Sequence, residues 1–464
     1  MVARKMKLQF YNSVTSKKEE FKSLSDKEVL VYGCGPTVYN SPHIGNFRTF
    51  VFYDLLNRVL LQNGYVVKNV INITDIDDKI IDRVNNEGVG FKELTQKYER
   101  IFLDQSNTIN ILPSTFNPRA SEHISEMIDF IKALMAKGVA YNIDGNIFFD
   151  TKEYSKYGKF VNIDDDNLSR EDNELGKKHP NDFALWKAWK DSDGEITWES
   201  DWGNGRPAWH TECAVLGTQL LGDSIDIHCG GIDLKFPHHE NESAQVEALL
   251  GNKFANYWLH SEHLIFDSEK MSKSLGNTLS ISDLLTKYSA ETLRLFLLSS
   301  HYRSKVSFSE KKLDDSSKMI DKINRFVNNV DLATIDINGV DYSRFHLDFL
   351  DALNDDLNTP EALGVFFDFI NTVNKNINND SMTDDLRIQS KIFINLFNSI
   401  FCVINTSSSD KMFIPKDIQN LASLREEMRS KFEWNEADKL RQMIDNLGWL
   451  IEDTKDGQKL IQKK

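Results

Sequence analysis

The stretch from Glu28 to about Thr74 constrains the fold more than any other part of this sequence. EVLVYG (28–33) is an apolar run of strand length that ends in a segment rich in glycine and proline. After the turn NSPHIGN, apolar residues recur at helical spacing as far as Gly64, and YVVKNVINIT (65–74) predicts a second strand. A strand, a helix and a second strand in this order form a parallel crossover. The chain therefore predicts an α/β domain that binds its ligands beyond the carboxyl ends of the strands.

Length and charge limit the remaining possibilities. The 464 residues are enough for several domains, and 40% hydrophobic with 27% charged residues is ordinary for a folded protein. A net charge of −15 argues against indiscriminate binding to polyanions, although a local basic groove could hold a nucleic acid. We find no signal peptide and no apolar run that would span a membrane, so we expect a soluble cytoplasmic protein with reduced cysteines.

The middle of the chain predicts an insertion into the α/β domain. A helix follows Pro118, with Ile124, Ile128, Ile131 and Met135 on one face and Gly138 at its end. Short apolar runs then alternate with polar loops from about residue 140 to 200, which is unlike the alternation of strands and helices before it.

The chain beyond about Ser309 predicts helices. The stretch DDLNTPEALGVFFDFI indicates a helix start, in which Thr359 caps the helix and Pro360 occupies its first turn. SSSD (407–410) is typical of a linker, and a small unit containing WNEADKLRQMIDNLGW follows.

The stretch FPHHENE (236–242) carries two histidines and two glutamates within five residues. On a helix, residues four apart share a face, so His238 and Glu242 point together while His239 turns away. One imidazole and one carboxylate are half of a four-coordinate zinc site. The stretch could equally be the polar start of a helix. His239 and Glu240 are expected to support the site or to face solvent.

Thiolates would complete such a site, and three of the four cysteines lie in the α/β part of the chain. These are Cys34, Cys213 and Cys229, and their spacing does not choose two of the three. Alternatively, all three are buried small apolar residues.

Two further stretches suit the binding of phosphate. SPHIGN places an imidazole and Gly45 just ahead of a helix N-terminus, where the helix dipole and the backbone N–H groups favour an anion. SEKMSKSLGN carries two lysines three residues apart, which suits the stabilisation of charge that develops on phosphate. Taken singly, the first could be a simple turn and the second an exposed basic loop.

Together these motifs resemble the cysteinyl-tRNA synthetases, a family of class I aminoacyl-tRNA synthetases. The resemblance runs in order over nearly the whole chain, through CGPTVYNSPHIGN, NITDIDDKII, DFALWK, WGNGRPAWHTEC, DIHCGGIDLKFPHHENE, EKMSKSLGN, HYRS and DDLNTPEA. It implies a Rossmann-like parallel-sheet catalytic domain split by an insertion, an α-helical anticodon-binding region and a small C-terminal unit. The implied boundaries are 1–120 and 206–262 for the two catalytic halves, 121–205 for the insertion, 263–310 for the lysine loop and stem-contact region, 311–405 for the helical region and 411–464 for the C-terminal unit.

The resemblance assigns roles to particular residues. One zinc ion per chain would be held by Cys34, Cys213, His238 and Glu242, and Cys34 and Cys213 would thereby also face the substrate. Thr74 and Trp209 match positions that line the cysteine pocket. The nucleotide would be contacted by His43, Gly45, Asn46, Asp233, Lys270 and Lys273, among which His43, Asn46 and the two lysines are the catalytic candidates.

The implied reaction uses ATP with Mg²⁺ to activate L-cysteine and then transfers it to tRNA-Cys, in a protein expected to be a monomer that contacts no membrane. Two residues depart from the family pattern. Asn46 replaces the last histidine of the HIGH signature and cannot carry charge, and Cys229 stands at a position associated with glycine. We expect the enzyme to remain active with Asn46 at this position. We expect Cys229 to lie near the nucleotide without a role in the site.

Three other functions are compatible with parts of the sequence. A ligase of the mycothiol pathway resembles the catalytic half and joins cysteine to an amino sugar, and a non-catalytic tRNA-binding paralogue would keep the fold without the reaction. The complete KMSKS signature argues against the paralogue. A zinc-stabilised structural protein would leave the lysine loop unexplained.

Overall fold

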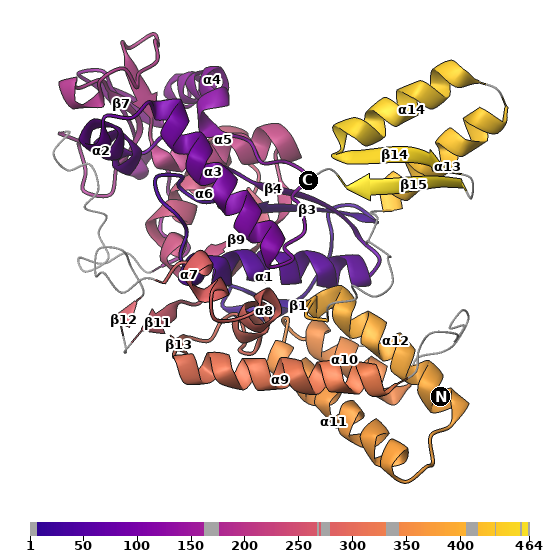
Figure 1. Ribbon diagram of the computed structural model, residues 1–464. Coiled ribbons are helices and arrows are strands. Elements are labelled where there is room, and N and C mark those ends of the chain that lie inside the picture. Colours follow the sequence, from indigo (N-terminus) through magenta and orange to yellow (C-terminus); the bar gives the residue numbers. More distant parts are fainter. Residues whose placement is uncertain are drawn as a thin grey trace. The chain divides into compact units, whose positions relative to one another are not determined.

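The computed structural model describes residues 7–161, 176–266, 269–270, 279–330, 343–404, 416–431, 433–454 and 457–462. The chain divides into two compact units, Met1–Ile404 and Asn405–Lys464 (Figure 1). Each has apolar clusters of its own. Among the described helices, none combines the length and the apolarity that crossing a bilayer requires.

A four-stranded parallel sheet forms the centre of the first unit. Its strands lie in the order β10 (Ala255–Ser261), β9 (Ile225–Gly231), β3 (Glu28–Gly33) and β4 (Val66–Ile71). The helix α1 (Ile44–Gln62) connects β3 to β4, so the predicted parallel crossover is confirmed. The helix ends as the glycine signal predicts, because Gly64 adopts φ +88° directly beyond the C-cap residue.

Helices cover both faces of this sheet, and the strand alternation assigns each side chain to one of them. In β3, Val29 and Val31 pack into the cluster that contains α1, whereas Tyr32 packs into the cluster that contains α5 (Trp209–Leu221). A parallel sheet covered on both faces is the Rossmann-like arrangement that the sequence predicts. With both faces covered, the carboxyl edge of the sheet is the expected place for a ligand-binding site.

The segment between the two halves of this sheet has its own antiparallel sheet. Its strands lie in the order β5 (Ala140–Ile143), β6 (Asn146–Phe149), β7 (Phe183–Ala188) and β8 (Gly205–Pro207). Ahead of it lies α4 (Ile124–Ala136). The predicted apolar face of this helix is partly wrong, because its buried residues are Ile124, Met127, Phe130, Ile131 and Leu134. Ile128 and Met135 are only half-buried, since the face in contact with the core is rotated toward Met127 and Phe130.

Ten further α-helices and strands of the described residues precede the helical bundle in the first unit. They are β1 (Gln9–Asn12), β2 (Lys17–Glu20), α2 (Asp78–Glu87), α3 (Phe91–Thr108), α6 (Glu240–Leu250), β11 (Leu264–Phe266), β12 (Glu269–Lys270), α7 (Ile281–Leu285), α8 (Ala290–Leu298) and β13 (Val306–Phe308).

A bundle of long helices completes the first unit. Its members are α9 (Glu310–Asn329), α10 (Arg344–Asn354), α11 (Thr359–Asn378) and α12 (Asp384–Phe401). The predicted cap of α11 is wrong by one residue. Asn358 is the N-cap residue, and its side chain accepts a hydrogen bond from the N–H of Glu361, while Thr359 begins the helix and is buried.

The second unit packs two helices with a hairpin. The elements are α13 (Lys416–Ser430), α14 (Trp434–Asn446) and the antiparallel strands β14 (Trp449–Thr454) and β15 (Gly457–Gln462). Ile418, Ala422, Ile444, Trp449 and Ile451 form its core. The sequence SSSD lies outside the described residues.

Candidate functional site

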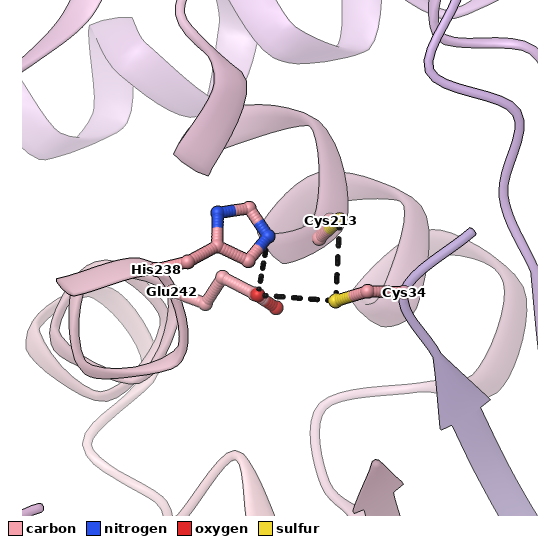
Figure 2. Close-up of side chains that lie close together, drawn as sticks. All are labelled: Cys34, Cys213, His238 and Glu242. Atoms are coloured by element: carbon pink, nitrogen blue, oxygen red, sulfur yellow. Dashed lines mark hydrogen bonds and ion pairs between the residues drawn. The ribbon is translucent and has the colours of Figure 1, made fainter. Parts of the chain in front are cut away.

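Four potential ligands meet at the carboxyl edge of the parallel sheet. Cys34 directly follows β3, Cys213 lies in α5, His238 lies in the turn before α6, and Glu242 lies in the first turn of α6 (Figure 2). Their ligand atoms all lie within 4.8 Å of one another, and all four side chains are buried. The structure thus brings together the four residues that the sequence assigned to zinc.

The distances within this group are those of side chains that surround a common point. The Sγ of Cys34 lies 3.9 Å from the Sγ of Cys213 and 3.6 Å from Oε1 of Glu242. The same Oε1 lies 3.0 Å from Nε2 of His238. The histidine lies outside α6, because Lys235–His239 form a separate turn in which Phe236 has an extended backbone (φ −145°, ψ 132°). This extended residue precedes HHENE, and His239 and Glu240 have helical backbone angles, so the predicted i,i+4 contact between His238 and Glu242 is confirmed.

Glycine at position 35 allows Cys34 to approach the neighbouring strand end. A Cβ atom at Gly35 would lie 1.5 Å from the backbone oxygen of Asn72, which no side chain could occupy. The N–H of Gly35 instead donates to Oδ1 of Asn72. This close approach brings the Cys34 thiol to within reach of α5 and α6.

Electrostatic coupling favours charged ligands in this buried place. Burial raises the pKa of the Glu242 carboxyl, but His228 and His238 outweigh burial and lower that pKa to about 2. Burial lowers the pKa of His238, but Glu242 and Cys213 raise it to about 10. Burial likewise opposes ionisation of Cys213, yet hydrogen bonding with Cys34 and His238 lowers its pKa to about 6. An anionic oxygen and an anionic sulfur thus face one centre.

The donor set fits a zinc ion. Two sulfurs, one imidazole nitrogen and one carboxylate oxygen are the ligand types that zinc takes in four-coordinate sites. Nε2 of His238 makes no hydrogen bond of good geometry among the described residues, as expected of a nitrogen that is directed at an ion. Its other nitrogen, Nδ1, lies 2.7 Å from Nδ1 of His210, which fixes the ring.

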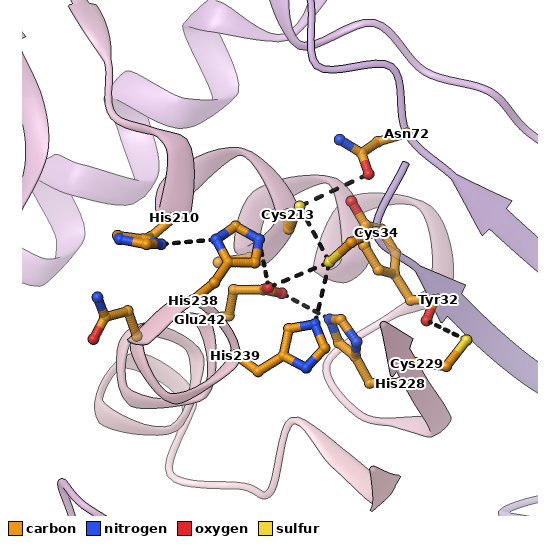
Figure 3. A network of polar contacts seen from close by, with 12 residues as sticks. Tyr32, Cys34, Asn72, His210, Cys213, His228, Cys229, His238, His239 and Glu242 are labelled. Carbon is orange, nitrogen blue, oxygen red and sulfur yellow. Dashed lines mark hydrogen bonds and ion pairs between the residues drawn. The ribbon is translucent and has the colours of Figure 1, made fainter. Parts of the chain in front are cut away.

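A second group of potential ligands shares two members with the first. Cys34, His228, His239 and Glu242 also place their ligand atoms within 4.8 Å of one another, and all are buried (Figure 3). Glu240 is buried as well, and its carboxylate accepts hydrogen bonds from the N–H groups of Gly158 and Phe160. Of the two expectations for His239 and Glu240, exposure to solvent is therefore wrong, because both side chains are fully buried.

A third group, Asp150, His179 and Asp182, lies in the inserted segment. Both oxygens of Asp182 already accept hydrogen bonds, one from Thr151 and the other from the Tyr141 hydroxyl and the His179 N–H. These bonds leave little capacity for an ion.

The residues assigned to the cysteine pocket border the four-ligand group. The Trp209 ring stacks on His238 with centroids 4.2 Å apart. Thr74 is buried, and its hydroxyl accepts a hydrogen bond from the side chain of Asn72. The carboxylate of Glu212 is also buried, has no hydrogen-bond partner in the described part of the chain, and has a pKa well above its usual value because of burial and the nearby Cys213.

His43 and Asn46 form a reciprocal cap at the N-terminus of α1. Nδ1 of His43 accepts from the N–H of Asn46, and Oδ1 of Asn46 accepts from the N–H of His43, at 3.1 and 3.0 Å. Gly45 lies between them in the first turn of the helix. Asp233 is half exposed just beyond β9, with Oδ1 4.0 Å from Nδ1 of His263. All four residues lie at strand ends or at the helix start, where a nucleotide would bind.

The two signature lysines are only partly covered by the structure. Lys270 ends β12, of which only the backbone is described, and Lys273 lies outside the described residues.

Three of the four buried histidines that accompany the ligand group were missed in the sequence analysis. His210, His228 and His239 lie around the ligand group (Figure 3). His260 lies behind His239, with Nε2 2.8 Å from Nδ1 of His239. Of these four residues only His239 was considered. A signal was available for one of them. In β9 the alternation of side chains places His228 on the face opposite Ile227 and Cys229, toward α5 and α6. Cys229 itself is buried in β9, with its sulfur 3.4 Å from the backbone oxygen of Tyr32, and belongs to neither group.

Two domain families match the chain. Residues 20–318 match the tRNA synthetases class I (C) catalytic domain, and residues 348–402 match the DALR domain.

Solved structures of low sequence identity share the fold. Methionyl-tRNA synthetase of Mycobacterium tuberculosis bound by methionyl-adenylate has a TM-score of 0.59 at 14% identity, covering 81% of this chain and 92% of that one. LeuRS of Agrobacterium radiobacter K84 in a ternary complex has a TM-score of 0.61 at 11% identity, covering 82% and 85%.

A curated relative is similar along its full length. The cysteine–tRNA ligase of Finegoldia magna is 41% identical over 459 residues, which cover 97% of this chain and 98% of the relative. Together with the catalytic and DALR matches, this identity shows that the chain belongs to the cysteine–tRNA ligases, which are class I aminoacyl-tRNA synthetases.

Proposed function

We propose that this ligase activates L-cysteine with ATP and transfers it to tRNA-Cys, with a zinc ion that recognises the substrate thiol. The observation that carries the proposal is the buried group of Cys34, Cys213, His238 and Glu242 at the carboxyl edge of the sheet, beside Trp209.

The proposed reaction has two steps that balance without a redox partner. A carboxylate oxygen of cysteine attacks the α-phosphorus of Mg·ATP, the bond from that phosphorus to the bridging oxygen breaks, and pyrophosphate leaves. The 2′-hydroxyl of the terminal adenosine of the tRNA then attacks the carbonyl carbon of cysteinyl-adenylate. AMP leaves with the electron pair, and the hydroxyl proton passes to solvent. Positioning and charge stabilisation supply most of the catalysis.

The four buried residues would hold one zinc ion per chain. When bound, zinc would supply a preference for a thiolate over a hydroxyl. Trp209 fixes the ring of His238 by stacking, and His210 fixes its second nitrogen. Thr74 is held by Asn72, the residue that also positions the Cys34 loop through Gly35.

Such a site addresses the main difficulty of choosing cysteine. A thiol and a hydroxyl differ little in size. A pocket that distinguishes cysteine from serine by the shape of this one group would reach only about 10–200-fold discrimination. A ligand set that contains two sulfurs and excludes water instead distinguishes the two substrates by the chemistry of the atom itself.

The nucleotide would lie against the start of α1. Gly45 leaves the backbone accessible, and the aligned N–H groups of the helix favour the phosphates. We assign His43, Asn46 and Asp233 to contacts with ATP and the substrate amino group, and Lys270 and Lys273 to the charge that develops on the phosphates. The reciprocal cap fixes the His43 and Asn46 side chains, which supports this assignment.

The helices after residue 310 would bind the anticodon arm. The DALR match at 348–402 supports this assignment, and we propose 311–405 as the helical anticodon region and 411–464 as a further tRNA-binding unit. The remaining boundaries are proposed as 1–120, 121–205, 206–262 and 263–310. Unpaired bases would be read there by stacking and by hydrogen bonds to their edges.

Cysteine-dependent exchange between pyrophosphate and ATP tests the proposal. We expect exchange with cysteine and little with serine in the wild type, together with about one zinc per chain. Cys213→Ser should lose the cysteine-dependent exchange, while Cys229→Ser, which changes a buried thiol outside the group, should retain it. Full discrimination by metal-free protein would disprove the role of zinc, and exchange that does not depend on cysteine would disprove the substrate.

A further inference from the structure

The carboxyl edge of the sheet holds more metal-binding side chains than one zinc ion needs. We call the group of Cys34, Cys213, His238 and Glu242 the thiol position. The second group, in which His228 and His239 replace Cys213 and His238, is called the imidazole position. Each places its four ligand atoms within 4.8 Å of one another, and every member is buried.

We propose that the imidazole position is an alternative binding position for the same zinc ion. This inference rests on the proposed function for the thiol position and adds a second set of ligands beside it. In the imidazole position, His228 and His239 would hold the ion in place of Cys213 and His238. Cys34 and Glu242 remain bound throughout, and no electron is gained or lost.

The two shared residues face both positions at once. Oε1 of Glu242 lies 3.0 Å from Nε2 of His238, while its Oε2 lies 2.7 Å from Nε2 of His228. The sulfur of Cys34 lies 3.9 Å from the sulfur of Cys213 and 3.3 Å from Nε2 of His239 (Figure 3). An ion could therefore move from one position to the other without a change in the backbone.

The surroundings of the imidazole position repeat those of the thiol position. Nδ1 of His239 lies 2.8 Å from Nε2 of His260, whose Nδ1 lies 2.8 Å from the Ser13 hydroxyl. This chain fixes the ring of His239 so that Nε2 points at Cys34, as His210 does for His238. Outer partners that hold the second nitrogen of an imidazole are typical of metal ligands.

Aromatic stacking gives the same correspondence. Trp258 stacks on His228 with centroids 4.5 Å apart and planes inclined by 16°. Trp209 stacks on His238 at 4.2 Å and 26°. Each position thus has one imidazole clamped by an indole ring, which leaves its Nε2 directed at Glu242.

The imidazole position keeps its full set of ligands when Cys213 is not a ligand. Cys34 and Glu242 supply two negative charges, which balance a divalent cation, and the two imidazoles bind as neutral groups. The thiol position adds a third negative charge from Cys213. When Cys213 is lost, both positions balance a divalent cation, but only the imidazole position still offers it four ligands.

The proposal predicts that the two thiol ligands are not equivalent. In a single site, loss of either cysteine would have the same effect on metal content. With two overlapping positions, Cys34→Ser removes a ligand from both, whereas Cys213→Ser and His238→Gln leave the imidazole position complete.

Metal content and cobalt spectra of the purified full chain test this difference. We expect Cys213→Ser and His238→Gln to retain about one zinc per chain and Cys34→Ser to lose it. In the cobalt form, the sulfur-to-cobalt charge-transfer band of Cys213→Ser should fall to about half that of the wild type, because one thiolate remains of two. Adding His239→Gln to Cys213→Ser should abolish binding, and Cys229→Ser should match the wild type.

Equal loss of metal in Cys213→Ser and Cys34→Ser would overturn the imidazole position. Circular dichroism of each variant shows whether it is folded, and His238→Gln repeats the test if Cys213→Ser is not. These results are separable from the proposed function. If Cys213→Ser retains metal, the imidazole position is supported even when no cysteine-dependent exchange is found. If Cys213→Ser and Cys34→Ser lose metal equally, the imidazole position is disproved even when the wild type shows normal exchange.

Discussion

Asn46 shows how one side chain can stabilise the start of a helix at the proposed nucleotide site. Its amide oxygen accepts from the N–H of His43, and its own N–H donates to the imidazole of His43. These two bonds occupy donors that a helix start leaves without partners. The amide at this position therefore retains the local structure although it cannot carry charge.

Removal of that amide should cost stability. We expect Asn46→Ala to lower the free energy of unfolding by about 1 kcal/mol, because the N–H of His43 loses its acceptor. Urea unfolding monitored by circular dichroism measures the loss. Asn46→Asp is the matched control, since a carboxylate at this position can accept the same bond and favours the helix N-terminus. An equal loss in both variants would contradict the capping role.

His346 in α10 gives the helical bundle a dependence on pH. It is fully buried beside Phe393, and burial lowers its pKa to about 4. In the unfolded chain this imidazole binds a proton near pH 6.5, whereas in the native protein it is protonated only near pH 4. The stability of the native state therefore falls as the pH decreases from 6.5 to 4, by at most about 3 kcal/mol.

His346→Gln should remove this part of the acid sensitivity. Urea unfolding of the wild type and the variant at pH 7, 5 and 4 measures it. We expect the difference in stability between the two to change in favour of the variant as the pH falls. Parallel pH profiles would show that another group is responsible.

At this scale the sequence predicted local relations better than distant ones. The contact between His238 and Glu242 followed from a spacing of four residues. The choice of Cys34 and Cys213 from three cysteines came from resemblance alone, because these sulfurs lie 179 residues apart in the chain and meet only through the sheet. His260 was not found, since its partner His239 lies on another element.

At the scale of elements, α1 connects the sheet to the helices that follow it. Asp54 and Arg294 form a fully buried ion pair between α1 and α8, and Asp54 also pairs with Arg58 at 2.8 Å. Arg294 donates to the backbone oxygens of Phe401 and Ile109. The last turn of α12 is thereby bonded to the same guanidinium that binds α1.

Loss of this carboxylate should be costly. We expect Asp54→Asn to lower the free energy of unfolding by about 3–5 kcal/mol, because it leaves the buried Arg294 without its counter-charge. Glu310→Gln is the control, since it breaks an exposed ion pair with Lys287 and should cost less than about 1 kcal/mol. Denaturant unfolding compares the two, and similar losses would refute the assignment.

Elements were predicted well where packing and local pattern agree. The helix α1 and the strand β3 were found because their apolar residues face buried surroundings on one or both sides. The predicted buried face of α4 included Ile128 and Met135 and left out Met127 and Phe130. The two sets could not be distinguished, because the half-buried residues are as apolar as the buried ones. The extended backbone of Phe236, just ahead of HHENE, was not predicted, since no local pattern in this stretch indicates it.

At the scale of the whole molecule, every proposed ligand of zinc lies in the first unit. The second unit has a core of its own residues and contributes none of the ligand atoms. Activation of cysteine is therefore proposed for the first unit alone, whereas binding of the tRNA is proposed for helices of the first unit and, in addition, for the second unit.

A chain that ends after Ile404 tests this separation. We expect cysteine-dependent exchange to remain close to that of the full chain, because the site and the core around it are retained. The KM for tRNA in aminoacylation should rise, since the unit from 405 to 464 is proposed to bind the tRNA. A proportionate loss of both activities would contradict the separation.

The overall class of the fold could be read from the sequence, but the strand order could not. The crossover between β3 and β4 is local and was found. The pairing of β3 with β9 joins residues 31–33 to residues 227–229, on opposite sides of the inserted segment. No local pattern specifies that neighbour, because it depends on how the two halves of the sheet meet.

The long separation between the proposed ligands has a consequence for how the protein is made. Cys34 leaves the ribosome 208 residues before Glu242, and at a synthesis rate of about 5–20 residues per second this interval lasts roughly 10–40 s. Throughout that time the thiol has neither its carboxylate neighbour nor the cover of α6. The proposed zinc ion would therefore find its full set of ligands only after about half of the chain has been made, and until then Cys34 would be open to oxidants.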